Sequence, residues 1–381
     1  MKVIHVIPNY FPQFGGSVKT VSDFLKAFPN SEVISFDTKI LTERLPFDHL
    51  VHHIKTGPCL WHKDTHFLCK EAKKKAEDLA KKADLIFCHQ LFRAHNHWVK
   101  NFCHKHKIPY VVVPHGAMDP WVFTYRALRK KIWYRLFGHK FLEDASFVLT
   151  ATKREAEKMN SRYHGKNITT VFWPTETVAA KNKKQDQDDL RKKLNLPPKT
   201  RLLLFIGRFD PCKRIMELIE IFAKAKTKQT HLVIAGVNFF YTEQELQQKI
   251  NETKSSKVHL LGPHYGEEKN NLYSAVDGYI SLSHKENFSY TAAEALAAGL
   301  PLLLSPGHDL AGDLEPDLGW FLKTNKEEEV LKAIEKFDQV SQEKLEKMGK
   351  NSRKWADENL VPSRFQLNMK KLVQKTLGRE V

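Results

Sequence analysis

Short, continuously apolar runs recur along the chain, and helical stretches separate them. The runs of the first half lie at 2–8, 32–36, 84–89, 110–116 and 146–152. Within them, apolar residues follow one another without the alternation expected of a strand with one wet face, as in Tyr-Val-Val-Val at the start of 110–116. Strands of this kind are buried on both faces. Their alternation with helices indicates parallel sheets that are covered by helices on either side.

A second series of runs follows a polar stretch at 179–200 that is rich in Lys, Asp and Gln. Its members are 201–209, 231–236, 258–262, 278–284, 301–307 and 319–323. The 381 residues are also too many for one ordinary hydrophobic core. The sequence therefore predicts an α/β protein of two doubly wound domains that face a central cleft. In such sheets, ligands bind beyond the carboxyl ends of the strands.

Positive charge is the most unusual global property of the chain. Lys and Arg outnumber Asp and Glu by 61 to 44, which is a net charge of +17. Residues 1–175 hold 28 of the basic and 15 of the acidic side chains, so +13 of that charge lies in the first half. A field of this sign favours nucleic acid, anionic lipid headgroups or phosphorylated substrates as partners.

The cytoplasm is the location that the sequence leads us to expect. No apolar run approaches the roughly 20 residues that are needed to span a bilayer. The N-terminus reads directly into a strand rather than into a signal peptide. The five cysteines are odd in number and scattered, which suits a reducing compartment better than a disulfide framework.

Two loops of the first half carry candidate binding residues. Gly15 and Gly16 precede a helix, where their backbone N–H groups could approach an anion. The alternative is a plain strand-to-helix turn with Ser17 as the N-cap. His115 comes at the carboxyl end of the fourth apolar run, where it could donate a hydrogen bond to a sugar hydroxyl or to a developing charge. The alternative is an ordinary loop histidine.

A pair of cations follows the first strand of the second series. Arg208 comes directly after Gly207, and Lys213 stands five residues later at the start of an apolar-periodic helix. Two cations and a helix N-terminus that converge on one loop predict a diphosphate site, since several fixed donors stabilise dispersed negative charge. The alternative is a pair of solvated surface cations.

Two glutamates flank a turn in the stretch His-Lys-Glu-Asn-Phe-Ser-Tyr-Thr-Ala-Ala-Glu at 284–294. Glu286 lies in the loop beyond a buried strand, and Glu294 lies about one turn into the next helix. The turn between them offers backbone N–H groups to an anion, and it consists of Asn287, Phe288 and Ser289. A carboxylate on each side of a phosphate cradle matches the hydroxylated ends of a sugar nucleotide. The alternative for Glu294 is a first-turn glutamate that the helix dipole favours.

These motifs resemble those of the retaining glycosyltransferases called group 1 or family 4, whose signature is Glu-x7-Glu followed by Gly-x-Pro. Here the signature spans 286–301, and the likeness extends over nearly the whole chain. The resemblance implies the GT-B fold, with two Rossmann-like domains and a last helix that crosses back to the first. It assigns residues 1–175 with 363–381 to an acceptor-binding domain, and residues 176–362 to a donor-binding domain.

The resemblance also implies roles for the candidate residues. Arg208 and Lys213 would bind the donor diphosphate, and Glu294 would hold the ribose. Glu286, with the backbone of 287–289, would hold the transferred sugar, and His115 would contact it from the other domain. Glu286 and His115 are thus the expected catalytic residues. The donor-binding set is completed by residues of the two loops: Asn287, Phe288, Ser289, Gly15 and Gly16.

The family implies a reaction that needs no cofactor beyond the nucleotide-diphosphate sugar itself. Attack from the front face would retain the anomeric configuration, and Arg, Lys and helix dipoles would replace a metal ion. The acceptor would be a glycan or a lipid-linked glycan, as in the assembly of cell-surface polysaccharide, and the nucleotide base would lie near 263–265. Two departures stand out: Ser289 occupies a position where relatives have Gly, and 171–178 lacks the Pro-Asn-Gly found in many of them.

Other interpretations stay open at this point. The fold could serve a nucleotide-sugar epimerase or a phosphorylase. A basic nucleic-acid-binding protein would explain the charge, but it would leave both glutamates unexplained, so we expect no nucleic acid partner. Histidines and cysteines crowd 88–106, although their spacing fits no standard zinc site. Basic and apolar residues interleave at 121–143, either as a core-packed helix or as a helix for an anionic membrane surface at the cytoplasmic face.

Overall fold

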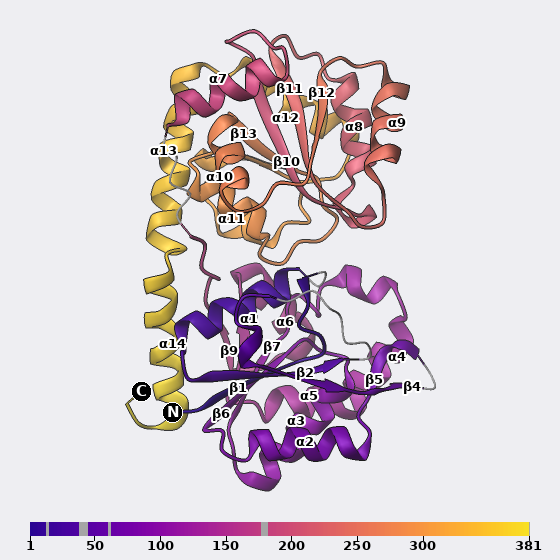
Figure 1. The fold of residues 1–381 in the computed structure, drawn as a ribbon, viewed down its shortest axis with the longest axis vertical. Helices are drawn as coiled ribbons and strands as arrows, with labels where there is room; N and C mark the ends of the chain where they lie inside the picture. The colour runs from indigo at the N-terminus through magenta and orange to yellow at the C-terminus, as the bar shows by residue number, and fades with distance from the viewer. Residues whose placement is uncertain (13–14, 38–44, 60–61, 177–181, 381) are drawn as a thin grey trace. The chain divides into compact units, whose positions relative to one another are not determined.

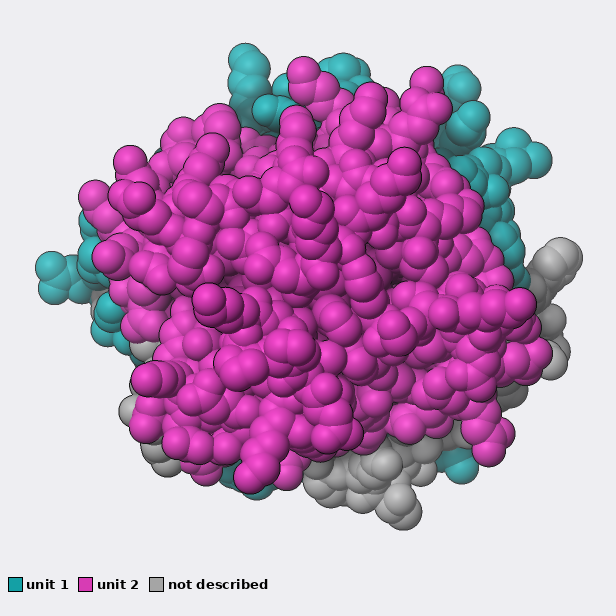
Figure 2. Space-filling view, turned by 90° about the horizontal axis from the view of Figure 1, so that it is seen from above, with its two compact units in different colours: residues 1–174, 362–381 teal, residues 175–361 magenta. Residues whose placement is uncertain are grey.

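Two compact units make up the protein (Figures 1 and 2). The computed structural model describes residues 1–12, 15–37, 45–59, 62–176 and 182–380. Unit 1 consists of Met1–Pro174 together with Pro362–Val381, and unit 2 consists of Thr175–Val361. Unit 1 is therefore assembled from both ends of the described chain.

Unit 1 contains a seven-stranded parallel sheet in the order β3-β2-β1-β6-β7-β8-β9. Its strands are β1 (Val3–Ile7), β2 (Ser31–Asp37), β3 (Val51–Lys55), β6 (Leu85–His89), β7 (Tyr110–Val113), β8 (Phe147–Thr150) and β9 (Ile168–Thr170), with a separate antiparallel pair, β4 (Gly57–Cys59) and β5 (His62–Phe67). The order reverses between β1 and β6, which is where ligands bind in doubly wound sheets.

Helices connect the strands of unit 1 (Figure 1). They are α1 (Gly16–Ala27), α2 (Lys70–Ala80), α3 (Ala94–His106), α4 (Ala127–Trp133), α5 (His139–Glu143), α6 (Lys153–Tyr163) and α14 (Pro362–Leu377), with short turns η2 (Asp48–Leu50), η3 (Pro120–Thr124) and the π-helical η4 (Tyr134–Gly138). Helix α14 packs on this unit: Phe365 is buried and meets the rings of Phe24 and Trp173 edge-on. The return of the last helix to the first unit is therefore as predicted.

Unit 2 contains a six-stranded parallel sheet in the order β12-β11-β10-β13-β14-β15. Its strands are β10 (Arg201–Phe209), β11 (Thr230–Asn238), β12 (Val258–Gly262), β13 (Gly278–Ser281), β14 (Leu302–Leu304) and β15 (Gly319–Phe321). Its helices are α7 (Lys183–Lys193), α8 (Ile215–Lys224), α9 (Glu243–Thr253), α10 (Gly266–Ala275), α11 (Tyr290–Ala297), α12 (Glu327–Gln339) and α13 (Gln342–Asn359), with turns η5 (Pro211–Lys213), η6 (Asp309–Asp313) and η7 (Pro316–Leu318). Here the strand order reverses between β10 and β13.

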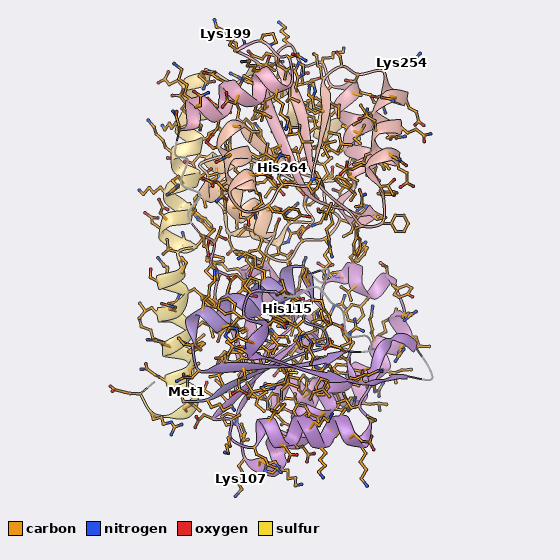
Figure 3. The ribbon with its side chains drawn as sticks, viewed as in Figure 1. Met1, Lys107, His115, Lys199, Lys254 and His264 are labelled. Atoms are coloured by element: carbon orange, nitrogen blue, oxygen red, sulfur yellow. The ribbon has the colours of Figure 1, made fainter. Side chains whose placement is uncertain are left out.

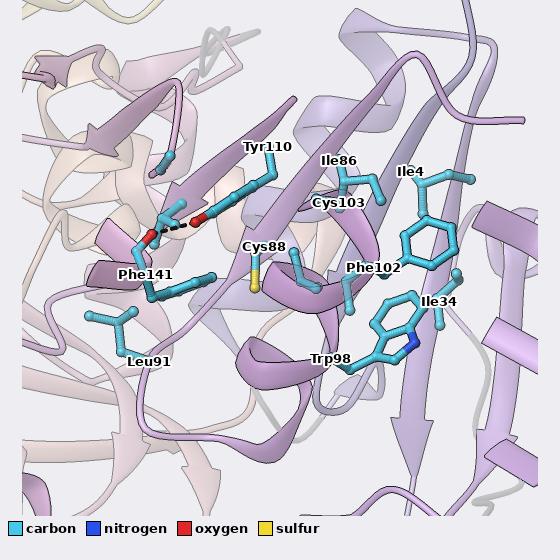
Figure 4. Close-up of a cluster of buried hydrophobic side chains, with 14 of the residues drawn as sticks. Ile4, Ile34, Ile86, Cys88, Leu91, Trp98, Phe102, Cys103, Tyr110 and Phe141 are labelled. Carbon is cyan, nitrogen blue, oxygen red and sulfur yellow. Dashed lines mark hydrogen bonds between the residues drawn. The ribbon is translucent and has the colours of Figure 1, made fainter. Parts of the chain in front are cut away.

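The central strands of both sheets are buried on both faces, which is why their sequences show continuous apolar runs. All five residues of β1 and of β6 are buried. In unit 1 the side chains of Cys88, Trp98 and Phe102 point into one cluster beneath the sheet (Figure 4). Within it the buried Tyr110 hydroxyl donates to the Phe141 carbonyl oxygen at 2.6 Å, so its polar atom is satisfied. Burying each large apolar side chain contributes about 1.5–3 kcal/mol.

The prediction of two parallel, doubly wound sheets is confirmed, and the differences are local. The polar stretch at 179–200 contains helix α7, which the prediction treated as a linker. The strand expected over 278–284 ends at Ser281. The segment 121–143 is not one regular helix, because η3 precedes α4 and a π-helical turn joins α4 to α5. No helix in the described ranges is long and apolar enough to cross a bilayer.

Candidate functional site

The predicted diphosphate cations lie at the carboxyl end of β10. Arg208 is the penultimate residue of the strand, and its guanidinium lies over the Phe239 ring, 4.5 Å from the centroid. Lys213 ends the short turn η5, where the Asp210 carboxylate accepts the backbone N–H of Cys212 at 2.7 Å. This cap turns the chain immediately after the strand. It therefore places both cations at the switch point between β10 and β13.

Lys213 and Glu286 are in direct contact. The Lys213 ammonium donates to Oε1 of Glu286, and the Ser283 hydroxyl donates to the same oxygen at 3.3 Å. The pKa of Lys213 is lowered to about 8, chiefly by burial and in the same direction by the neighbouring Arg208 guanidinium. At this pKa the ammonium keeps its proton at neutral pH.

Backbone pairing holds the Glu286 loop against the loop that follows β14. The Glu286 N–H donates to the Gly307 carbonyl at 2.8 Å, and the Asp309 N–H donates to the Glu286 carbonyl at 2.9 Å. A Cβ on Gly307 would collide with the Ser283 carbonyl oxygen, so glycine is what allows this approach. His308, between these partners, is fully buried, and burial lowers its pKa to about 3.

The backbone conformation of the turn between the two glutamates explains why relatives have glycine where this chain has Ser289. Ser289 has a φ of 57°, in the left-handed region, and stands at the N-cap of α11. Glycine adopts this conformation at the lowest cost, which fits its use at this position in relatives. The structure also leaves Oδ1 of Asn287 buried, with no hydrogen-bond partner among the residues that it describes.

Glu294 is the fifth residue of α11, and α11 has no acidic side chain in its first turn. The alternative of a first-turn glutamate is therefore wrong. The carboxylate of Glu294 accepts hydrogen bonds from the Lys269 ammonium at 2.8 Å and from the Tyr273 hydroxyl at 3.0 Å, both on α10. Burial raises the pKa of Tyr273 well above its usual value, with the adjacent Glu294 charge adding to the shift, so this hydroxyl stays a donor.

In unit 1, the glycine loop after β1 begins helix α1. Gly15 is the N-cap with a φ of 62°, and Gly16 is the first helical residue. Ser17 is therefore not the cap, which corrects that alternative. The Gln90 side-chain amide, just beyond β6, donates to the Ser17 hydroxyl at 3.3 Å. Residues after β1 and β6 thus meet at the switch point of this sheet.

His115 lies two residues beyond β7, and Figure 3 labels it among the loops of unit 1. Its φ of 52° places it in the left-handed region. Nε2 of His115 is 3.0 Å from Nδ1 of His89, and the rings are stacked. The backbone is clamped as well: the buried Glu155 carboxylate accepts the N–H of Gly116 at 2.6 Å and that of Ala151 at 2.7 Å.

The structure brings some of the predicted residues together and leaves others apart within their units. Lys213 meets Glu286, whereas Glu294 is bonded to helix α10 instead. That His115 and the glycine loop share a ligand with unit 2 stays a prediction. In the loop expected near the base, Tyr265 is 66% exposed, and Figure 3 labels the adjacent His264.

Several partners of the candidate residues were not predicted. They are His5, His89, Glu155, Lys269 and Tyr273. His5 and His89 lie inside or at the end of apolar runs and read there as core residues. Lys269 and Tyr273 are four residues apart on α10, hence on one face, but nothing in the sequence indicates that this face meets Glu294.

The histidine- and cysteine-rich segment forms no metal site in the described ranges, where no group of three or more His, Cys, Asp or Glu side chains is arranged to hold an ion. Cys88 and Cys103 are buried free thiols in the core, and burial raises the pKa of both. The side chain of Cys59 lies outside the described part. In the same segment, Nε2 of His95 contacts the His89 carbonyl oxygen at 2.8 Å.

Known proteins resemble this chain in sequence and in fold. A trehalose synthase of Pyrococcus horikoshii is 29% identical over 153 residues, which are 36% of each chain. A GDP-mannose:cellobiosyl-diphosphopolyprenol alpha-mannosyltransferase of Xanthomonas oryzae pv. oryzae is 23% identical over 318 residues, covering 80% of this chain and 78% of that one. Anabaena HepE, solved in complex with UDP and glucose, has a TM-score of 0.78 at 16% identity, covering 98% and 100% of the two chains.

Family matches cover both units. The chain spans only about a third to a half of the length of several of these curated relatives, 36% for the Pyrococcus enzyme and 48% for a Thermococcus litoralis trehalose synthase. Residues 14–175 match the family described as Glycosyltransferase Family 4, and residues 186–355 match Glycosyl transferases group 1. The chain, with its GT-B fold, belongs to the group 1, or family 4, glycosyltransferases.

Proposed function

We propose that the protein is a retaining glycosyltransferase that moves a sugar from a nucleotide-diphosphate donor to a glycan or lipid-linked glycan acceptor. The observation that carries this proposal is the contact of the Lys213 ammonium with the Glu286 carboxylate, beside Arg208. A phosphate-binding group adjacent to a hydroxyl-binding group matches a ligand in which a sugar is joined to a phosphate.

The surrounding turn supplies further groups of the same kind. Oδ1 of Asn287 is a buried acceptor without a partner among the described residues, and a sugar hydroxyl would satisfy it. Glu294 is held by Lys269 and Tyr273, and each carboxylate oxygen keeps a second lone pair with which to accept a ribose hydroxyl. The turn and the two glutamates that flank it thus offer acceptors for two sugars, and Arg208 and Lys213 offer cations for the phosphates.

The names of the relatives support this class of donor. The Xanthomonas mannosyltransferase is named for GDP-mannose and for a diphosphopolyprenol-linked acceptor, and HepE was solved with UDP and glucose. Both pair a nucleoside diphosphate with a hexose. We extend that class to this chain, without choosing a base or a sugar, and we place the reaction in the cytoplasm.

In the proposed reaction the bond between the anomeric carbon and the diphosphate oxygen breaks, and the acceptor oxygen bonds to the same face of that carbon. The acceptor proton passes to the departing diphosphate. Arg208 and Lys213 stabilise the charge that develops there, and Glu286 fixes the sugar. We propose that these cations replace a metal ion, so the rate is expected to be unchanged by EDTA.

A thermal-shift screen with UDP, GDP, ADP, TDP and CMP tests the proposal first. One of the diphosphates is expected to raise the melting temperature, because a ligand that binds only the folded state stabilises it. Glu286→Ala should lower turnover more than it lowers donor affinity, whereas Arg208→Ala should lower affinity. No shift with any nucleotide, or wild-type turnover in Glu286→Ala, would refute the assignment.

The same assay separates the alternative reactions. An epimerase would change the donor sugar in the absence of any acceptor, and a phosphorylase would need inorganic phosphate. Retention is read from the anomeric configuration of the product by NMR. An inverted product would contradict the mechanism while leaving the transfer itself intact.

A basic apolar surface, defined as residues 121–136, supports peripheral membrane contact. Leu128, Ile132 and Leu136 are 72%, 49% and 79% exposed. Leu128 and Ile132 share one face of α4, and Leu136 follows in the π-helical turn η4. Trp121 and Tyr125 add exposed rings at 46% and 60%. The cations of this surface are Arg126, Arg129, Lys130, Lys131 and Arg135.

We propose that this surface lies on anionic lipid headgroups, where an apolar stripe inserts and its cations pair with phosphates. Vesicles of phosphatidylcholine with phosphatidylglycerol should retain the protein at low salt, and pure phosphatidylcholine should not. The triple change Arg129→Glu, Lys131→Glu, Arg135→Glu should abolish retention. The matched control changes Lys73, Lys74 and Lys75 to Glu on α2, where no apolar stripe is exposed. Equal loss of vesicle retention in both variants would show that the net charge of the protein, and not this surface, causes the binding.

A further inference from the structure

Three imidazole rings form a line through unit 1. Nδ1 of His5, on β1, is 3.1 Å from Nε2 of His89, at the end of β6. Nδ1 of His89 is 3.0 Å from Nε2 of His115, beyond β7. His5 and His89 are both fully buried. The line therefore connects the candidate sugar-contacting residue to the interior of the sheet.

Sheet register creates this line. His5 pairs with Phe87 across β1 and β6, and the two rings stack with centroids 5.0 Å apart. His89 is two residues beyond Phe87 and so lies on the same face of the sheet. Nε2 of His95 contacts the His89 carbonyl oxygen at 2.8 Å, which holds the strand end. Each ring is thus fixed by neighbours as well as by the line itself.

The two inner rings are neutral at physiological pH. Burial lowers the pKa of His5 to about 3, and burial together with the neighbouring His115, His5 and His95 lowers the pKa of His89 well below its usual value. A neutral imidazole has one N–H donor and one lone-pair acceptor. Where His115 is neutral as well, two hydrogen bonds along the three rings allow only two arrangements of the protons.

The two arrangements differ at the buried end of the line, which is His5. In one, every ring carries its proton on Nδ1, and Nε2 of His5 is a bare lone pair. In the other, every proton is on Nε2, and His5 has an N–H there. Nε2 of His5 is buried with no hydrogen-bond partner in the described part of the chain. A buried N–H without an acceptor is rarer in proteins than an acceptor without a donor, so the first arrangement is favoured.

We propose that His5 and His89 are positioning residues that fix His115 as the Nδ1–H tautomer. His89 donates to Nε2 of His115, which leaves Nδ1–H as the only hydrogen that the outer ring can donate. His115 then acts as a hydrogen-bond donor with a set orientation and not as a base. That this hydrogen meets the transferred sugar rests on the proposed function, whereas the tautomer itself does not.

Histidine-selective ¹⁵N NMR of the free protein tests the tautomer directly, with the His115 signals assigned by His115→Gln. In the wild type, Nδ1 of His115 is expected to be protonated. His89→Leu removes the donor and should shift the proton toward Nε2, and His89→Gln, whose amide can donate to Nε2, should restore it. Protonation of Nε2 in the wild type, or no change in His89→Leu, would overturn the inference, and the wild-type result stands even if His89→Leu does not fold.

Turnover provides the second readout, with UDP-glucose and GDP-mannose as trial donors. His89→Leu should lower the rate by about 10-fold or more, which is the loss found when the partner that orients a metal-bound histidine is removed, and His89→Gln should recover part of it. The matched control is His231→Leu, which removes another His–His contact of 2.9 Å, partly buried in unit 2. If neither donor reacts, the NMR result still decides the tautomer, so failure of the proposed function can be told from failure of this inference.

Discussion

Two ion pairs of unit 2 hold the side chains that we assign to the donor. Lys213 contacts Glu286, and Lys269 contacts Glu294. Each pair keeps a mostly buried carboxylate compensated, since an uncompensated buried charge is costly. In the function that we propose, a bound diphosphate would give Lys213 a second anionic partner and would release Glu286 in part toward sugar hydroxyls.

Glu294→Ala is expected to weaken binding of the matching nucleoside diphosphate about 10- to 100-fold, because a hydrogen bond to a charged group contributes about 1.5–3 kcal/mol. Isothermal titration calorimetry measures this change. Glu294→Gln keeps an acceptor for Tyr273 and should lose less. Unchanged affinity in the Ala variant, with a normal melting temperature, would show that Glu294 does not contribute to nucleotide binding.

The affinity for the nucleoside diphosphate is expected to fall as the pH rises above about 8. Burial lowers the pKa of Lys213 to about 8, so the free protein loses this ammonium proton above that pH, whereas the bound diphosphate needs it. Calorimetry from about pH 7 to about pH 9.5 should show the decline. Lys213→Arg keeps its charge throughout and should bind with a flatter profile. A wild-type affinity that is constant over this range would contradict the prediction.

Single residues were predicted where chemistry and position agreed. Arg208 lies at the end of a buried strand, Lys213 and Glu286 follow buried strands, and all three carry charge at the edge where ligands bind. His5 could not be predicted, because a histidine within an apolar run reads as a core residue and its hydrogen-bond partner, His89, lies 84 residues away. The role of Lys269 could not be predicted for a similar reason, since it depends on how α10 packs against α11.

At the scale of elements, strands with continuous apolar runs were predicted well and those without were missed. Strand β10 spans 201–209 and β12 spans 258–262, as expected from the sequence. Strand β3 lies at the edge of its sheet and reads Val-His-His-Ile-Lys, which has too few apolar residues to be recognised. Helix α7 was missed because its face is almost wholly polar, and only Leu190 and Arg191 are buried.

The edge pair β2–β3 should lose stability as the pH rises. His53 lies between the carboxylates of Asp37 and Asp48, at 2.8 and 3.0 Å. The Asp37 hydrogen bond raises the pKa of His53 above 6.5, and the Asp48 hydrogen bond and charges add to the rise. A histidine with a raised pKa contributes stability that is fully present below its unfolded pKa and is lost as the pH passes through its folded pKa.

Urea unfolding at pH values below and above the ordinary histidine pKa of 6.5 measures this loss of stability. The variant His53→Gln should remove the part of the pH dependence that His53 causes. The neighbouring His52, which is 38% exposed and pairs with Glu32, provides the control as His52→Gln. The same pH slope in the wild type and in His53→Gln would show that the Asp37–His53–Asp48 cluster contributes nothing.

At the scale of the whole molecule, unit 1 depends on a helix from the far end of the sequence. Phe365, Met369 and Val373 on α14 are buried, whereas Leu367 on the same helix is 53% exposed. Phe365 closes an aromatic group with Phe24 and Trp173. The sequence predicted the return of this helix only through the family resemblance, because its apolar spacing does not reveal which surface it covers.

Phe365→Ala is expected to destabilise unit 1 by about 3–5 kcal/mol, which is the usual cost of removing a buried Phe side chain. Urea unfolding followed by tryptophan fluorescence detects it, since Trp173 touches Phe365. Leu367→Ala is the matched control and should change stability by no more than about 0.5 kcal/mol. Equal effects of the two substitutions would show that α14 does not stabilise unit 1 through this face.

The divided chain of unit 1 also sets an order of assembly on the ribosome. Residues 175–361 must be translated after the sheet of unit 1 and before α14. At synthesis rates of about 5–20 residues per second, this delay amounts to roughly 10–40 s. During that time the nascent sheet exposes the apolar surface around Phe24 and Trp173, so newly made chains should depend on chaperones until the last helix emerges.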